Sequence, residues 1–309
     1  MEKINGGMSN DVFKYKNLLF KFYNYSQLKL NYNWEQTIQM KFYSLGLNTP
    51  RIYQSIEVDG KLIGRIEQFI ESNPITIDEF RCNIKSCANI LKQIHEISLE
   101  GLGITSFDFF DYINLWEKNV LELKSFDLDY QILNNLDYQI LNDFDHILKL
   151  GQLVKNKINE ICKSLAIPKV VSHNDFQQLN LLIDSSGKWY IIDFEYSSLN
   201  YPFYDIANYF AECSFNNIEL KYYPELYPSK ESRYLFYSYY FNLSLNLSLN
   251  NNENFEQIDE LVTEFSKLVD YTWFIWSVIK YHDSKSTDYL KYGLIRKTNF
   301  IKLTTEYKN

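Results

Sequence analysis

The chain has 309 residues, of which 46% are hydrophobic and 23% are charged. This composition excludes a disordered protein and predicts a packed globule with one large domain or two lobes. The net charge of -8 argues against broad binding to nucleic acid or to anionic membranes. The sequence shows no CxxC pair, no signal-peptide core and no apolar run of membrane-spanning length. We therefore expect reduced thiols and a cytoplasmic protein without nucleic-acid or membrane partners.

The N-terminal part predicts strands around one helix. Short apolar and aromatic runs predict the strands, and apolar residues at helical spacing from Trp34 to Leu45 predict a helix that Gly46 ends. Asp59-Gly60 is a hairpin turn signal. The expected elements are strands 12–15 and 18–22, a helix over 32–45, and strands 51–58 and 62–70. This order predicts a small antiparallel sheet with one helix across it.

The remaining chain predicts a larger and mainly helical part. An apolar stripe from Ile84 to Ile94 indicates a helix. Strands are expected at 169–172, 181–183 and 189–192, followed by further helices. The change of pattern near residues 71–74 predicts two units, 1–72 for nucleotide binding and 73–309 for catalysis and substrate binding. The fold class is therefore α+β.

The segment that begins at His173-Asn174-Asp175 carries the strongest chemical signal. Asp175 and Asn180 lie in one loop between predicted strands, and Asp193 ends the next strand. Phosphoryl transfer needs one carboxylate to orient the attacking hydroxyl, and oxygen ligands that hold Mg²⁺ against the nucleotide phosphates. Asp and Asn are also ordinary turn residues, but their joint pattern between apolar strands favours the chemical interpretation.

Two weaker signals lie near the N-terminus. Gly6-Gly7-Met8-Ser9-Asn10 suits a loop that contacts phosphate through backbone amides and polar side chains, although it equally suits a flexible N-terminus. Lys21 on a strand could contact phosphates if Glu35 on the next helix holds it in place. An edge-strand lysine that faces solvent is the alternative for Lys21.

Together these motifs resemble the choline/ethanolamine kinase family, within the aminoglycoside phosphotransferase-like superfamily. Aminoglycoside phosphotransferases usually have His-Gly-Asp where this chain has His173-Asn174-Asp175. Residues 192–200 and 204–212 look like the family's Asp-Phe-Glu-Tyr motif and its Asp-Ile-Ala helix. Residues 65–70 and 272–277 align as well, so the resemblance covers nearly the full length. It is strongest to bacterial choline kinases.

The resemblance implies a bilobal protein-kinase-like fold, with a small antiparallel-sheet lobe that carries one helix and a larger, mainly helical lobe. It implies transfer of the γ-phosphoryl group of ATP to the hydroxyl of choline, with ATP and Mg²⁺ as cofactors. Asp175 would be the catalytic base, Asn180 and Asp193 the magnesium ligands, and Asp205 a brace of the catalytic loop. The residues implied in nucleotide binding are Gly7, Ser9, Asn10, Lys21, Glu35, and the backbone of Gln68, Phe69 and Ile70.

Choline carries a permanent cation without an N–H donor, so a protein holds it with aromatic faces and nearby carboxylates. Trp273 and Trp276 are three positions apart and share one helical face. An aromatic stripe of the core is the alternative for these side chains. Further candidates for the substrate pocket are Tyr196, Tyr289 and Tyr292 as walls, and Glu195 and Glu212 as sources of negative charge.

Other functions stay open from the sequence. The acceptor could be ethanolamine, another amino alcohol, thiamine or an aminoglycoside, and the chain could be a catalytically inactive kinase-like binding module. A protein kinase is disfavoured because Asp193-Phe194-Glu195 lacks the glycine of Asp-Phe-Gly. We expect a small-molecule substrate and a monomer or homodimer.

Overall fold

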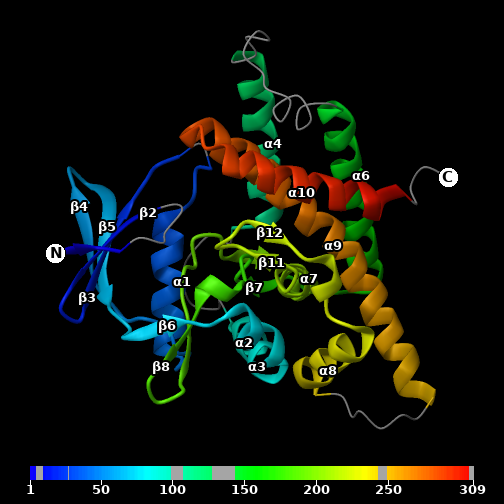
Figure 1. Ribbon diagram of the computed structural model, residues 1–309, viewed down its shortest axis with the longest axis horizontal. Coiled ribbons are helices and arrows are strands. Elements are labelled where there is room, and N and C mark those ends of the chain that lie inside the picture. Colours follow the sequence, from blue (N-terminus) through cyan, green and yellow to red (C-terminus); the bar gives the residue numbers. More distant parts are fainter. Residues whose placement is uncertain (5–9, 27, 99–106, 127–142, 243–248, 306–309) are drawn as a thin grey trace.

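A computed structural model describes residues 1–4, 10–26, 28–98, 107–126, 143–242 and 249–305. The first part is a five-stranded antiparallel sheet in the order β1-β2-β3-β5-β4, with helix α1 beside it (Figure 1). Its elements are β1 (Glu2–Lys3), β2 (Asn10–Tyr15), β3 (Leu18–Tyr23), α1 (Tyr32–Ser44), β4 (Ile52–Val58) and β5 (Lys61–Gln68). The predicted small sheet with one helix is confirmed.

The local structure of this sheet follows from its sequence. The Asn31 side chain accepts a hydrogen bond from the N–H of Trp34 at 3.0 Å, and this cap begins α1. Asp59 and Gly60 have φ values of 52° and 73°, which the tight turn between β4 and β5 requires. Antiparallel pairing places Lys21 on β3 directly opposite Arg65 on β5.

The rest of the described chain is mainly helical, with three small sheets. The strands are β6 (Ser72–Pro74), β8 (Leu181–Asp184) and β9 (Trp189–Ile191) in one sheet, β7 (Val170–Ser172) with β10 (Ser198–Asn200), and β11 (Phe215–Asn216) with β12 (Lys221–Tyr222). The helices are α2 (Ile77–Cys82), α3 (Ile84–His95), α4 (Phe109–Phe126), α6 (Phe144–Ser164), α7 (Pro202–Glu212), α8 (Lys230–Phe241), α9 (Leu249–Ser284) and α10 (Thr287–Thr304).

Two features of this helical part position the site. Helix α9 packs against α4, α6, α7 and α10, so its buried face holds the C-terminal core together. Strand β6 pairs with β8, and the loop from Ser172 to Leu181 connects β7 to β8. Strand β6, which follows the five-stranded sheet along the chain, therefore lies beside the strand that follows the Asp175 loop. The division of the chain after residue 72 stays a prediction.

A glycine in α6 makes the packing of α6 on α9 testable. A Cβ atom on Gly151 would lie 2.1 Å from Cζ of Tyr271, whose hydroxyl donates to Glu117 at 2.5 Å. Helical Gly→Ala usually stabilises by about 0.5–1 kcal/mol, but this overlap has to displace a hydrogen-bonded ring. We expect Gly151→Ala to lower the free energy of unfolding by about 1–3 kcal/mol in urea titrations.

The exposed neighbour Gln152 provides the control for this packing prediction. Its exposed side chain donates a hydrogen bond to Asn156 one turn along the same helix, so Gln152→Ala should change the free energy of unfolding by about 0.5 kcal/mol or less. A Gly151→Ala protein that is more stable than the wild type would contradict the described packing of Tyr271.

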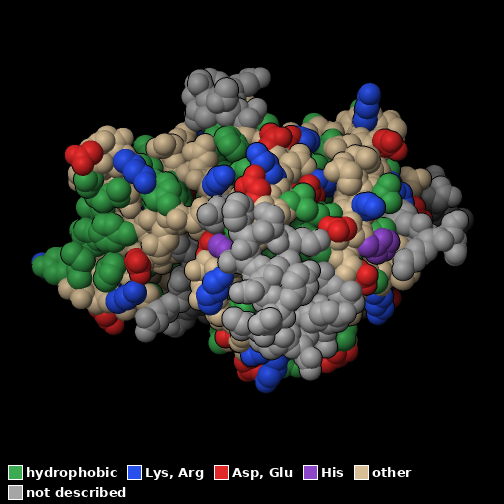
Figure 2. Space-filling view, turned by 90° about the horizontal axis from the view of Figure 1, so that it is seen from above, with side chains coloured by type: hydrophobic (Ala, Val, Ile, Leu, Met, Phe, Trp, Pro, Cys, Tyr) green, Lys and Arg blue, Asp and Glu red, His purple; other side chains and the backbone are tan. Residues whose placement is uncertain are grey.

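The five-stranded sheet exposes several hydrophobic side chains. In Figure 2 the end of the molecule formed by the five-stranded sheet carries many hydrophobic side chains, and the exposed hydrophobic residues of its strands include Tyr15, Tyr53 and Val58.

The cysteines are free thiols, of which only Cys82 is exposed. Burial raises the pKa of Cys87 to about 12. Among the described residues, no helix combines the length and apolarity that a membrane span requires.

Candidate active site

A cleft of about 1110 Å³ is lined by residues of the five-stranded sheet and of the helical part. Most of the site residues predicted from the sequence meet in this cleft. They are Asn10, Lys21, Gln68, Phe69, Ile70, Asp175, Asn180, Asp193, Glu195, Tyr196, Glu212, Trp273, Trp276, Tyr289 and Tyr292. Glu35 lies behind Lys21 and is fully buried. Gly7 and Ser9 lie outside the described residues, so their nucleotide contacts stay predictions.

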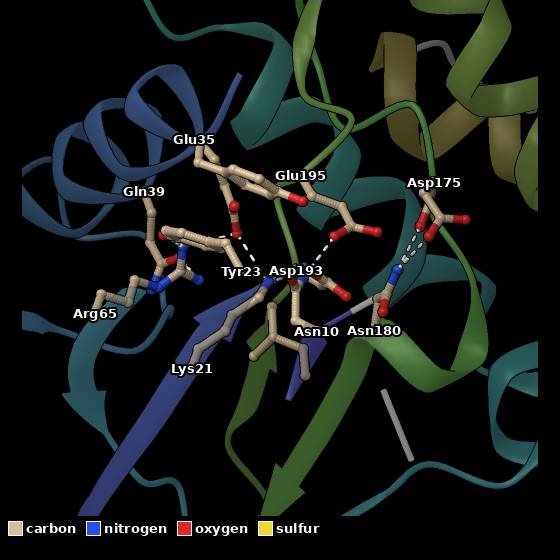
Figure 3. A network of polar contacts seen from close by, with 12 residues as sticks. Asn10, Lys21, Tyr23, Glu35, Gln39, Arg65, Asp175, Asn180, Asp193 and Glu195 are labelled. Carbon is tan, nitrogen blue, oxygen red and sulfur yellow. Dashed lines mark hydrogen bonds and ion pairs between the residues drawn. The ribbon is translucent and has the colours of Figure 1, made fainter. Parts of the chain in front are cut away.

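Asp175 is held by hydrogen bonds from its own loop, and Figure 3 shows Asn180 facing its carboxylate. Asn180 donates from Nδ2 to the Asp175 carboxylate and to its carbonyl, both at 2.9 Å. Gln177 donates from Nε2 to both carboxylate oxygens at 3.2 Å. Burial, followed by the nearby charge of Glu212, raises the pKa of Asp175 well above its usual range. The carboxylate is thus fixed in direction, and its surroundings favour proton uptake.

A buried aspartate, Asp205, holds the loop that carries Asp175. Asp205 accepts hydrogen bonds from the backbone N–H groups of His173 and Asn174, both at 2.7 Å. His95 lies 2.9 Å from the same carboxylate through Nε2. Asn174 has a φ of 64°, a left-handed conformation that asparagine tolerates better than most residues. Asp205 therefore braces the loop, which is the role that the family resemblance implied for it.

His173 ties this loop to the strand end that carries Asp193. Burial lowers the pKa of His173, so its imidazole is neutral near pH 7. Its Nε2 donates to the carbonyl of Ile192 at 3.0 Å, and its Nδ1 accepts from the N–H of Asp175 at 3.3 Å. A neutral ring with one donor and one acceptor satisfies both contacts. The positions of Asp175 and Asp193 are thereby linked.

Lys21 joins the two parts of the protein across the cleft. Its Nζ lies 3.0 Å from Oε1 of Glu35 and 2.7 Å from Oδ1 of Asp193. Burial acts to lower the pKa of Lys21, but Asp193 and Glu35 outweigh it and the pKa is raised. Burial alone would raise the pKa of Asp193, but Lys21 lowers it below its usual range. The predicted Lys21–Glu35 contact is present, and Lys21 does not face solvent.

Behind Lys21 lies a second buried cation that the sequence analysis did not single out. Arg65 donates to Glu35 at 2.7 Å and to Glu67 at 2.9 Å. It also donates to Gln39 at 2.9 Å and to the hydroxyl of Tyr23 at 3.1 Å. Because Glu35 is shared between two cations, Arg65 fixes the carboxylate that holds Lys21.

An aromatic wall closes the helical side of the cleft. Neighbouring rings stand almost perpendicular: Trp273 to Trp276 at 87°, Tyr196 to Trp273 at 86°, and Trp276 to Tyr289 at 78°. The indole N–H groups are engaged, Trp273 with Asn208 at 2.8 Å and Trp276 with the Tyr196 hydroxyl at 2.7 Å. The rings are therefore held in fixed directions while they line the cleft.

Charged groups flank this aromatic wall. Glu195 accepts from Nδ2 of Asn10 at 2.9 Å. Glu212 is ion-paired with Arg296 and accepts from Asn217 at 2.7 Å. Lys280 places its Nζ 5.9 Å from the ring centroid of Trp276. Burial lowers the pKa of Lys280, while Glu195 and Asp283 act in the opposite direction.

Gln68, Phe69 and Ile70, whose backbone is predicted to bind the nucleotide, line the cleft at the end of β5. Two of its backbone donors are already used, since the N–H of Gln68 donates to Arg51 at 2.8 Å and the N–H of Phe69 donates to Asn17 at 2.9 Å. Nucleotide contacts by the backbone of this segment would therefore be made by Ile70 and by carbonyl groups.

Four polar residues of the site were not predicted from the sequence: Gln177, Arg65, Asn217 and Arg296. Gln177 lies within the catalytic motif, whereas Arg65 comes to lie opposite Lys21 through the pairing register of β3 with β5. Asn217 and Arg296 belong to no motif that predicts chemistry. Only the tertiary structure brings them to Glu212.

The lysine–glutamate pair, the loop aspartate and asparagine, and the strand-end aspartate around one cleft define a kinase-like fold of the α+β class. The family model described as choline/ethanolamine kinase matches residues 1–301. The chain therefore belongs to the choline/ethanolamine kinase family, a family of phosphotransferases.

Individual relatives are named for choline, for ethanolamine or for both substrates. A choline/ethanolamine kinase of Rattus norvegicus is 28% identical over 251 residues, which span 75% of this chain and 60% of that protein. The match thus spans less than two thirds of the relative's own length. An ethanolamine kinase of Plasmodium vivax shares the fold with a TM-score of 0.78 at 24% identity, covering 97% of this chain and 80% of that chain. Choline kinase LicA of Streptococcus pneumoniae, also solved with AMP, has a TM-score of 0.67 at 20% identity, covering 99% of this chain and 94% of that chain.

Proposed function

We propose that the protein is a choline kinase, which transfers the γ-phosphoryl group of ATP to the hydroxyl of choline and releases phosphocholine and ADP. One observation carries the proposal: Asp175, Asn180 and Asp193 line the same cleft as an aromatic wall of fixed rings. The first group suits phosphoryl transfer, and the second suits a quaternary ammonium.

The protein's part in the reaction is to position and to neutralise charge. Asp175 orients the choline hydroxyl and accepts its proton, helped by the donors of Asn180 and Gln177 that fix its carboxylate. In the nucleotide complex, Lys21 would turn from Asp193 toward the phosphates while Glu35 keeps hold of it. Asn10 and the segment 68–70 lie along the nucleotide side of the cleft.

The donor set fits magnesium. The side chain of Asp193 is 34% exposed, and one of its carboxylate oxygens contacts Lys21. Asn180 directs its amide nitrogen to Asp175, so its amide oxygen can bind a hard cation. Among the described residues, no group of three or more His, Cys, Asp or Glu could hold a metal by itself. Magnesium in kinases typically takes one or two protein oxygens, waters and phosphate oxygens, and it neutralises the charge of the transferred group.

The wall favours choline over ethanolamine on physical grounds. Both oxygens of Glu212 are engaged, by Arg296 and by Asn217, and Asn10 occupies one oxygen of Glu195. The ammonium of ethanolamine needs hydrogen-bond acceptors, whereas the trimethylammonium of choline needs apolar faces and a negative field. The fixed rings supply such faces, and the two carboxylates supply the field without requiring a direct hydrogen bond.

An acceptor panel tests the substrate. ADP release should be measured with Mg-ATP and choline, ethanolamine, thiamine or an aminoglycoside, each over a range of concentrations. We expect the highest kcat/KM with choline, by about tenfold over ethanolamine, because an ammonium N–H that lacks an acceptor in a desolvated site costs about 1–3 kcal/mol. A higher kcat/KM with ethanolamine would identify ethanolamine, and not choline, as the preferred acceptor. No turnover with any acceptor would favour an inactive kinase-like binding module.

A further inference from the structure

The turn between β11 and β12 brings a polar side chain into the cleft from outside the catalytic motifs. Asn217 lines the cleft, and its Nδ2 lies 2.6 Å from Oε1 of Gln177 and 2.7 Å from Oε2 of Glu212. The turn is held by Asn216, whose Oδ1 accepts from the N–H groups of Ile218 and Glu219, both at 3.1 Å. Asn217 therefore bridges the residue that contacts Asp175 and the acidic residue beside the aromatic wall.

The residues at the two ends of this bridge determine which group donates in each of its hydrogen bonds. The Glu212 carboxylate can only accept, so the amide of Asn217 has to turn its NH₂ group toward it. The second hydrogen of that NH₂ group then points to the carbonyl oxygen of Gln177. Because this oxygen is engaged, the NH₂ group of Gln177 faces Asp175.

Arg296 anchors the far end of the bridge. It is fully buried, pairs with Glu212 and lies 3.1 Å from Asp270. The Cζ atom of its guanidinium group also lies 3.9 Å from the ring centroid of Phe215, the first residue of β11. An arginine that only donates therefore holds a carboxylate that only accepts, and the polarity of the bridge cannot reverse.

We propose that Asn217 is a positioning residue for Asp175, acting through Gln177. It holds the Gln177 amide so that a donor, and not the carbonyl oxygen, faces the Asp175 carboxylate. Without Asn217, the side-chain amide of Gln177 can flip, so that its oxygen faces Asp175. That oxygen would repel the Asp175 carboxylate and weaken its alignment with the acceptor hydroxyl. This role rests on the proposed phosphotransferase function.

Kinetics of three single variants test the role. Asn217→Ala should lower kcat about tenfold and leave the KM for ATP within about twofold, since losing an orienting residue typically costs 10–100-fold. Asn217→Asp should be slower still, because its carboxylate would face Glu212 and the Gln177 oxygen. Glu219→Ala is the matched control, since Glu219 lies in the same turn, pairs with Lys221 and does not line the cleft. Its kcat should equal that of the wild type.

A double-mutant cycle separates positioning from a merely structural effect. If Asn217 acts through Gln177, the Asn217→Ala/Gln177→Ala protein should be no slower than Gln177→Ala alone. Losses that multiply in the double variant, or an unchanged kcat in Asn217→Ala with an active wild type, would overturn the role of Asn217. A wild type without turnover on any acceptor would instead contradict the proposed function. Thermal melts of every variant show whether the fold is retained.

Discussion

Asp175→Asn is expected to lower kcat with choline about 10³-fold, while ATP still binds. General base catalysis typically contributes 10²–10⁴-fold, so the loss corresponds to about 4 kcal/mol of transition-state stabilisation. Asparagine has nearly the same shape as aspartate, and its amide oxygen can still accept from Asn180. The loop should therefore keep its structure and lose only the group that accepts the proton. Steady-state kinetics and a nucleotide-binding titration measure the two effects separately.

Asp184→Asn serves as the control for this variant. Asp184 ends β8 and accepts hydrogen bonds from Ser186 and Lys188 in the exposed turn that follows, outside the cleft. Its replacement should leave kcat unchanged. Turnover of Asp175→Asn near the wild-type value would show that another group takes the proton.

Trp276→Leu is expected to raise the KM for choline about 30-fold and to leave the KM for ATP unchanged. Loss of a desolvated cation–π contact costs about 2 kcal/mol, which converts to this factor. Leucine keeps an apolar side chain at a site where Trp276 is only 6% exposed, so the cleft is not simply opened. Trp276→Phe retains an aromatic face and should fall between the wild type and Trp276→Leu.

A neutral substrate analogue separates charge from shape. 3,3-Dimethylbutan-1-ol has the outline of choline with carbon in place of the charged nitrogen. If the wall recognises charge, Trp276→Leu should impair use of choline far more than use of this alcohol. Equal loss for both substrates would mean that Trp276 contributes shape alone.

The sequence predicted the parts of the site that depend on local order. Asp175 and Asn180 share one loop, and flanking apolar strands place Asp193 beside them, so a short stretch of chain specifies their meeting. The Lys21–Glu35 contact likewise follows from a strand and the next helix. The fold class was predictable for the same reason, since the order of strands and helices near the N-terminus matches the observed sheet.

Residues brought together by tertiary packing could not be predicted in this way. Asn217 is separated from Gln177 by 40 positions, and Arg296 from Glu212 by 84. Strands β6, β10, β11 and β12 are two or three residues long, too short for an alternating pattern to appear. Their pairing depends on contacts with distant segments, and the β11–β12 turn reaches the cleft only through that pairing.

The transfer itself is tested most directly by ³¹P NMR of the protein with ATP, Mg²⁺ and choline. A phosphocholine resonance should grow in step with ADP, require choline, and be absent with Asp175→Asn. ADP formation without phosphocholine, or no consumption of ATP by the wild type, would contradict phosphoryl transfer to choline in this cleft.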